Sequence, residues 1–218
     1  IINSKLTPYR SGLPVDNVPF VNMNQQDRKQ LEQTMRSLVG SLNWLSLATR
    51  PDIMTITNML ARYQHKPSPG HLDAAKHAIR YLKGTKTLGI RFSSKHNHPL
   101  ESYVKFPIIP NKITAMCDAN WGPQDQSTKR KTTTEVPLFH SRSLSGYIQW
   151  LNGPVHWVSK RQTITARSTA EAEIYATDEC TKNILHIRHI LNDLLLLPIF
   201  CPNETNIYND NNACVLWS

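Results

Sequence analysis

Residues 143–180 contain the pattern that most limits what this chain can fold into. Two short alternating runs, "SLSGYIQWL" and "PVHWVSKRQ", flank Asn152 and Gly153, and an Asn-Gly pair between such runs is typical of a tight β-hairpin turn. The segment that follows, "ARSTAEAEIYATDEC", is rich in small residues and indicates a helix that Ser168 can cap. A hairpin that leads directly into a helix predicts an α/β domain.

Further strands and helices extend this pattern on both sides. Ahead of the hairpin, "KITAMCDANW" (112–121) is a strand candidate, and "LGIRF" (88–92) indicates another, shorter one. After the helix, "TNIYN" (205–209) predicts a strand that runs into the helix-like "DNNACVLW" (210–217). From residue 112 onward the expected order is three strands, a helix, a strand and a helix.

Acidic residues recur along this order. Asp118 lies on the strand at 112–121, Glu173 lies early in the helix, and Asp210 ends the last strand. Mg²⁺ prefers oxygen ligands, so a few carboxylates on rigid neighbouring elements can hold it. Two such ions about 3.5–4 Å apart can activate the water that attacks a phosphate and stabilise the leaving oxygen. The trio therefore predicts a metal site for phosphate chemistry.

Helix geometry separates Glu173 from Glu171. Residues two apart on a helix point about 200° away from each other, so the two carboxylates cannot share a face. Glu173 continues the apolar stripe of the helix, and Glu171 does not. We expect Glu173 to face the sheet and Glu171 to face solvent or substrate. The stripe comprises Thr177, Cys180, Ile184, Ile187, Leu191 and Leu194.

Each acid alone has a simpler explanation. Glu173 can be a favourable charge in the first turns of a helix, Asp118 a turn residue at a strand end, and Asp210 the N-cap of the helix that follows it. The three together, in this order, are far more specific than any one of them.

The first part of the chain predicts a helical module after an extended lead-in at 1–24. A helical stripe runs from Leu31 to Leu45, Pro51 and Asp52 favour a second helix start, and Ser68 can cap a third helix that ends at Gly84. The expected inward residues of the third helix are Leu72, Ala75, Ile79 and Leu82. The other face of this helix is basic and carries Lys76, Arg80, Lys83 and Lys86. These charges can lie along a nucleic-acid backbone or can simply be solvated.

Composition bounds the class of protein. Residues 1–110 hold 15 Lys or Arg against 6 Asp or Glu, whereas residues 111–218 hold 10 against 10, which suits a phosphate-binding surface beside a carboxylate site. The longest apolar runs fall short of the ~20 residues that cross a bilayer, so we expect a soluble, intracellular protein. The four cysteines have no CxxC spacing and are expected to be buried, reduced thiols.

Five segments resemble the C-terminal polyprotein region of Ty1/copia-type LTR retrotransposons, which joins a helical connection to an RNase H domain. The resemblance covers 37–218 and is most specific at 141–176. The segments are "SLVGSLNWLSLATRPDI", "HLDAAKHAIRYLKGT", "CDANWG", "SRSLSGYIQWLNGPVHWVSKRQTITARSTAEAEIYA" and "IYNDNNA".

The resemblance implies an α/β, RNase H-like mixed sheet of three antiparallel hairpin strands, then a helix and a parallel strand, at 88–218. It also implies a connection region at 25–87 that follows a reverse transcriptase. The implied activity is cleavage of the RNA strand of an RNA/DNA hybrid with two Mg²⁺ ions, or Mn²⁺ as a substitute, in a cytoplasmic virus-like particle or the nucleus. The implied metal-binding catalytic residues are Asp118, Glu173 and Asp210, and the implied phosphate contacts, which can equally be exposed surface charges, are Lys160, Arg161 and Arg167.

The chain departs from this pattern at two places. The insertion between Trp121 and Ser141 is longer than the family's usual turn, and after Asp210 only "NNACVLWS" follows, without the fourth acid that completes such sites. Because the chain begins without Met and stops in a helix-like segment, we expect a piece of a longer protein with a truncated domain, weakly active or inactive on its own.

Other functions remain open on the sequence. "YNDN" has Asn211 where a polymerase hairpin needs a second acid, and an integrase would place its glutamate last. His186 and His189 have helical spacing but no evident partners for zinc. Trp121 and Trp157 suit a core better than base stacking.

The main alternative to a ribonuclease is an inactive retroelement remnant that at most binds nucleic acid or supports a reverse transcriptase.

Overall fold

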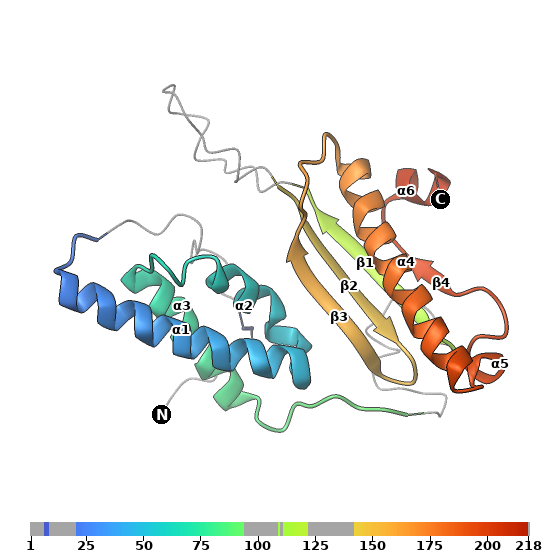
Figure 1. Ribbon diagram of the computed structural model, residues 1–218, viewed down its shortest axis with the longest axis horizontal. Coiled ribbons are helices and arrows are strands. Elements are labelled where there is room, and N and C mark those ends of the chain that lie inside the picture. The colour runs from blue at the N-terminus through green and yellow to red at the C-terminus, as the bar shows by residue number, and fades with distance from the viewer. Residues whose placement is uncertain (1–6, 9–20, 94–108, 110, 122–141, 218) are drawn as a thin grey trace. The chain divides into compact units, whose positions relative to one another are not determined.

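The computed structural model describes residues 7–8, 21–93, 109, 111–121 and 142–217, and the chain divides into two compact units, residues 1–90 and 91–218 (Figure 1). Most of the expected lead-in at 1–24 and the insertion after Trp121 lie outside the described residues.

The first unit is helical, as the sequence predicts. It contains α1 (Gln25–Ala48), the short 3₁₀ helix η1 (Pro51–Ile53), α2 (Met54–Ala61) and α3 (Pro69–Gly84). The side chain of Asn24 accepts the backbone N–H of Asp27 and caps α1, while Ser68 and His71 form a reciprocal cap at the start of α3. The buried core of the unit consists of Met35, Val39, Leu42, Ile53, Ile56, Leu60, Ala74, Ala75, Ala78 and Tyr81.

The predicted inner face of α3 is confirmed for Ala75, which is buried, and for Leu72 and Leu82, which pack against the core, but it is wrong for Ile79. Ile79 was expected inside but is 39% exposed, whereas Ala74 and Ala78 are buried. The helix packs through its alanines and Tyr81, because small side chains let it approach the core closely. The bulkier Ile79 is left on the surface.

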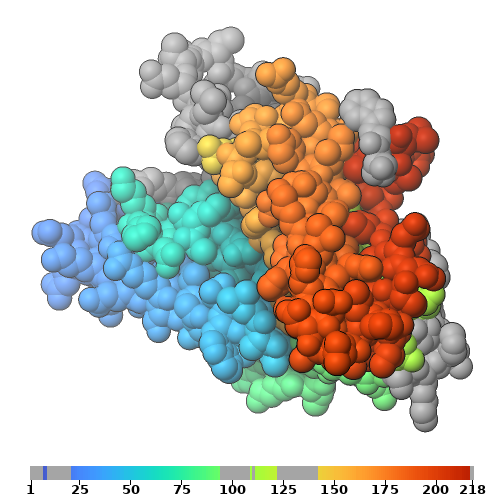
Figure 2. Space-filling view, turned by 45° about the vertical axis from the view of Figure 1, so that its right-hand side comes forward, coloured from blue at the N-terminus to red at the C-terminus, as the bar shows by residue number. Residues whose placement is uncertain are grey.

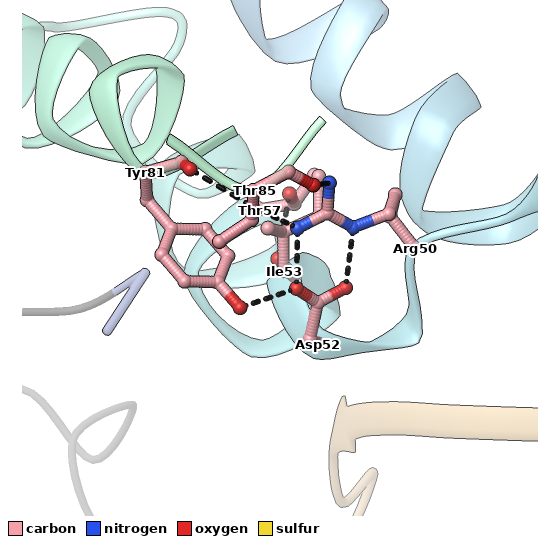
Figure 3. Close-up of polar contacts among 6 residues, drawn as sticks. All are labelled: Arg50, Asp52, Ile53, Thr57, Tyr81 and Thr85. Carbon is pink, nitrogen blue, oxygen red and sulfur yellow. Dashed lines mark hydrogen bonds and ion pairs between the residues drawn. The ribbon is translucent and has the colours of Figure 1, made fainter. Parts of the chain in front are cut away.

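A partly buried polar cluster joins the helices of this unit (Figure 3). Arg50, only 6% exposed, donates two hydrogen bonds to the carboxylate of Asp52, at 3.0 and 2.7 Å, and further ones to the carbonyl and hydroxyl oxygens of Thr85. The Tyr81 hydroxyl donates to the same carboxylate at 2.7 Å. Asp52, expected only to favour a helix start, therefore ties Arg50, two residues after α1, to Tyr81 in the last turns of α3.

The second unit contains a four-stranded mixed sheet in the order β3-β2-β1-β4. The strands are β1 (Thr114–Asn120), β2 (Leu144–Trp150), β3 (Pro154–Arg161) and β4 (Asn206–Tyr208). β1 pairs antiparallel with β2, β2 pairs antiparallel with β3, and β4 lies parallel to β1. The predicted hairpin is confirmed, with Asn152 at a φ of 58° in the turn.

The expected strand at 88–92 is wrong. These residues form no strand in the structure. The adjoining Ser93 N–H donates to the Asn152 carbonyl at the hairpin turn, and a Cβ added to Gly153 would lie 2.6 Å from the Phe92 ring. Phe92 and Ser93 thus lie at the turn without joining the sheet.

A long helix covers one face of the sheet (Figure 1). This helix, α4 (Thr169–Asp193), is followed by α5 (Leu197–Phe200) and, after β4, by α6 (Asn212–Trp217). The core between α4 and the sheet includes Ala115, Cys117, Tyr147, Cys180 and Ile184. Leu194, expected on the inner stripe, is exposed, because α4 has reached its C-terminal end there.

The outer surface of α4 and α5 faces the viewer in Figure 2 (orange to red).

In the described residues no helix combines the length and the apolar character that a membrane crossing needs. All four cysteines are free and buried, as predicted.

Candidate metal centre

The strand register places two of the three acids side by side. In the parallel pair, Thr114 lies opposite Asn206 and Met116 lies opposite Tyr208. Continued by two residues, the same register brings Asp210 opposite Asp118, just beyond the end of β4. Two carboxylates from different parts of the chain therefore meet where β1 lies beside the edge strand β4.

The start of α4 is fixed by several polar contacts. The Ser168 hydroxyl accepts the N–H of Glu171, and the Glu171 carboxylate accepts the N–H of Arg167, so both stabilise the first turn. The buried side chain of Gln162, at the end of β3, donates to the Ala172 carbonyl at 2.8 Å and to the Ser145 hydroxyl at 2.9 Å. Gln162 thereby ties the sheet to the residue before Glu173.

Glu173 faces the sheet and is only 5% exposed. Its carboxylate accepts a hydrogen bond from the Asn209 side-chain amide at 2.9 Å and another from the backbone N–H of Ala119, the residue after Asp118. Glu171, by contrast, is half-buried and engaged in the helix cap. The expected difference between the two glutamates is therefore present.

The carboxylates of Asp118, Glu173 and Asp210 form one cluster. One carboxylate oxygen from each lies within 4.8 Å of the other two, with Glu173 buried and both aspartates exposed. Three carboxylate oxygens on three separate elements suit a hard divalent cation, and the exposed side leaves room for water or a phosphate ligand. The trio can thus hold a metal ion.

The electrostatics of the cluster favour a cation. Burial raises the pKa of Glu173, and the charges of Asp118 and Asp210 raise it further against the hydrogen bonds from Asn209 and Ala119. Burial also raises the pKa of the neighbouring Cys117 thiol, so this thiol is neutral and adds no negative charge. A bound divalent cation would relieve the repulsion among the three carboxylates.

Asp210 is not the N-cap of the helix that follows it, which was the simpler explanation of this residue. The N-cap of α6 is Asn211, whose side-chain oxygen accepts the N–H of Cys214 at 3.0 Å. Asp210 precedes the cap, and its side chain is exposed within the acidic cluster.

The three predicted phosphate contacts differ in their surroundings. Lys160 is exposed on β3 but forms an ion pair with Glu179 of α4. Arg161 is half-buried at the end of β3, and Arg167 is exposed in the loop just before α4. Of the three, Arg167 lies closest along the chain to the acidic cluster. The basic residues Lys76, Arg80, Lys83 and Lys86 of the first unit are all exposed.

The structure also describes the two histidines and the two tryptophans that the sequence analysis weighed. His186 and His189 belong to no group of three potential metal ligands among the described residues, where the acidic trio is the one such group. Trp121 is 36% exposed rather than in the core, because its indole N–H donates to the Ala166 carbonyl and holds the ring at the end of β1. Trp157 is half-buried.

Sequence reasoning missed the residues that surround the acids. Asn209, Gln162 and the backbone N–H of Ala119 were not singled out for this role, because their contacts join segments far apart in the chain. The one available signal was their position, since Asn209 and Ala119 adjoin predicted metal ligands and Gln162 ends the "SKRQ" run.

Comparisons with known proteins found relatives along most of the chain. Secreted RxLR effector protein 161 from Plasmopara viticola is 32% identical over 147 residues, which is 67% of this chain and 85% of that protein. The Retrovirus-related Pol polyproteins from transposons RE1 and RE2 of Arabidopsis thaliana are 32% and 29% identical over 79% and 93% of this chain. The Transposon Ty1-DR5 Gag-Pol polyprotein of Saccharomyces cerevisiae is 26% identical over 88% of it.

This chain spans only 10–12% of the length of these polyproteins. No family model and no solved structure matches the chain.

Proposed function

We propose that this chain, which belongs to the family of Ty1/copia-type retrotransposon Pol polyproteins, contains a metal-dependent ribonuclease H that hydrolyses the RNA strand of RNA/DNA hybrids. The observation that carries the proposal is the convergence of Asp118, Glu173 and Asp210 within 4.8 Å of one another. They come from β1, α4 and the end of β4, which is the arrangement expected of an RNase H-like sheet.

The metal in this proposal is Mg²⁺, two ions in all, with Mn²⁺ as a substitute. The three carboxylates would hold it, and the ions would activate the attacking water and stabilise the leaving oxygen of the scissile phosphate. The buried position of Glu173 fixes one ligand, while the exposed aspartates leave the outer side of the cluster open to substrate. In the same proposal, residues 25–87 are a connection to the reverse transcriptase domain of the polyprotein.

The hybrid would lie across the exposed side of the acidic cluster. Arg167 is the best placed of the predicted phosphate contacts, because it is exposed and its backbone is held by Glu171 at the start of α4. Lys160 and Arg161 would extend the contact along the end of β3, although the ion pair of Lys160 with Glu179 competes with a phosphate contact. Such contacts give affinity and register without sequence preference.

The proposal is tested with an RNA/DNA hybrid labelled in its RNA strand. We expect cutting that requires Mg²⁺ or Mn²⁺, stops on addition of a chelator, and disappears in Asp118→Asn, because the cluster then loses one charged ligand. Asp178→Asn is the matched control, since Asp178 is exposed on α4 and pairs only with Lys182 among the described contacts.

Binding of the hybrid without any cutting would contradict the proposal, provided that it persists in a longer chain continuing the reading frame on both sides. That outcome would favour the alternative of an inactive nucleic-acid-binding remnant.

A further inference from the structure

One side chain links two of the three acids. Asn209 is half-buried between the end of β4 and Asp210. Its amide nitrogen donates to the Glu173 carboxylate at 2.9 Å, and its amide oxygen accepts the backbone N–H of Asn211 at 2.7 Å. The second bond closes a local turn around Asp210, because it joins Asn209 to Asn211, the residues on either side of Asp210 in the chain.

We propose that Asn209 is a positioning residue for the metal centre, which orients the Glu173 carboxylate and fixes the turn that carries Asp210. This inference rests on the proposed function, because it assumes that the acidic cluster binds a metal ion. Asn209 itself is not proposed as a ligand.

The geometry favours Glu173 as the main partner of the amide. The same nitrogen lies 3.3 Å from the Thr177 hydroxyl and 3.4 Å from the Cys117 sulfur, and both contacts are longer than the one to Glu173. A hydrogen bond to a carboxylate is also stronger than one to a neutral hydroxyl or thiol. Because the amide occupies one oxygen of Glu173, the carboxylate has a preferred orientation toward the two aspartates.

The chemistry of this position suits an amide. Asn209 offers a donor to Glu173 and an acceptor to the Asn211 N–H, and it brings no charge to a cluster that already holds three acids. Residues that orient metal ligands from outside the ligand set typically change metal affinity or activity 10- to 100-fold when they are replaced.

The test is calorimetric titration of the whole chain with Mn²⁺ alone, without nucleic acid. We expect the Kd for Mn²⁺ to rise roughly 10- to 100-fold in Asn209→Ala. Asn209→Ser should show the same loss, since a serine hydroxyl can still accept the Asn211 N–H but is too short to reach Glu173. In a cleavage assay at limiting metal, kcat should fall while KM for the hybrid stays unchanged.

Asn183→Ala is the matched control. Asn183 is also half-buried, and its amide nitrogen donates to the Tyr147 hydroxyl at 2.6 Å, two to three helical turns beyond Glu173 on α4. This variant should bind Mn²⁺ as the unaltered chain does.

The possible outcomes separate the two proposals. Unchanged Mn²⁺ affinity in Asn209→Ala, or a loss in Asn209→Ala that Asn209→Ser fully restores, would overturn the role of Asn209 toward Glu173 and leave the metal centre intact. Equal Mn²⁺ affinity in the unaltered chain and in Asp118→Asn would instead overturn the metal centre itself.

Discussion

Glu173→Gln is expected to abolish metal-dependent cleavage of the RNA strand, while Glu171→Gln leaves it within about threefold of the unaltered rate. Glu173 is buried beside Asp118 and Asp210, so the amide removes a charged ligand from the cluster. The bound metal stabilises the transition state, and a loss of several kcal/mol of this stabilisation reduces the rate on the order of 10³-fold or more. The measurement is the initial rate of hybrid cleavage for both variants.

The two substitutions form a matched pair, because they make the same chemical change two residues apart on one helix. Glu171 accepts only the Arg167 N–H among the described contacts, so its replacement weakens a helix cap by roughly 1 kcal/mol and leaves the cluster intact. Equal losses of activity in the two variants, with both still folded, would contradict the assignment of Glu173.

Asp52→Asn should destabilise the helical unit by about 1.5–3 kcal/mol at neutral pH, the range for hydrogen bonds to charged groups. The change turns one carboxylate oxygen into a donor that faces the Arg50 guanidinium, and it weakens the contact with the Tyr81 hydroxyl (Figure 3). Hydrogen exchange of peptides from α1 and α3 measures this loss separately from the sheet. Asp73→Asn, an exposed acid on α3, should change the same exchange by less than about 0.5 kcal/mol.

The destabilisation should depend on pH. Burial opposes ionisation of Asp52, but the hydrogen bonds from Arg50 and Tyr81 outweigh it and hold the pKa of Asp52 below its usual value of 3.8. The carboxylate therefore contributes its full stability above pH 3.8, and this contribution is lost as the pH falls through the lower pKa of the folded state. An Asp52→Asn effect that stays constant from pH 7 down to pH 2 would contradict this account.

Local sequence signals predicted the parts of the fold that short-range chemistry determines. The Asn152-Gly153 turn, the Ser168 cap and the positions of the four sheet strands all depend on residues close together in the chain. The separation of Glu173 from Glu171 also followed from helical periodicity alone.

Contacts between distant segments could not be predicted in this way. The face of α3 depends on how closely Ala74 and Ala78 pack, and residues 88–92 form no strand although their pattern alternates. The hydrogen bond from Asn209 to Glu173 joins residues 36 positions apart. Periodicity indicates roughly which face of an element turns inward, but not how closely that face packs or which residues it meets.

The central claim is that Asp118, Glu173 and Asp210 form one metal centre, and Mn²⁺ bound to crystals of the chain tests it most directly. Anomalous diffraction at the manganese edge should show a peak in contact with all three carboxylates, and this peak should disappear in Asp118→Asn. Manganese peaks that all lie elsewhere, in crystals whose acidic cluster is free of lattice contacts, would contradict the claim.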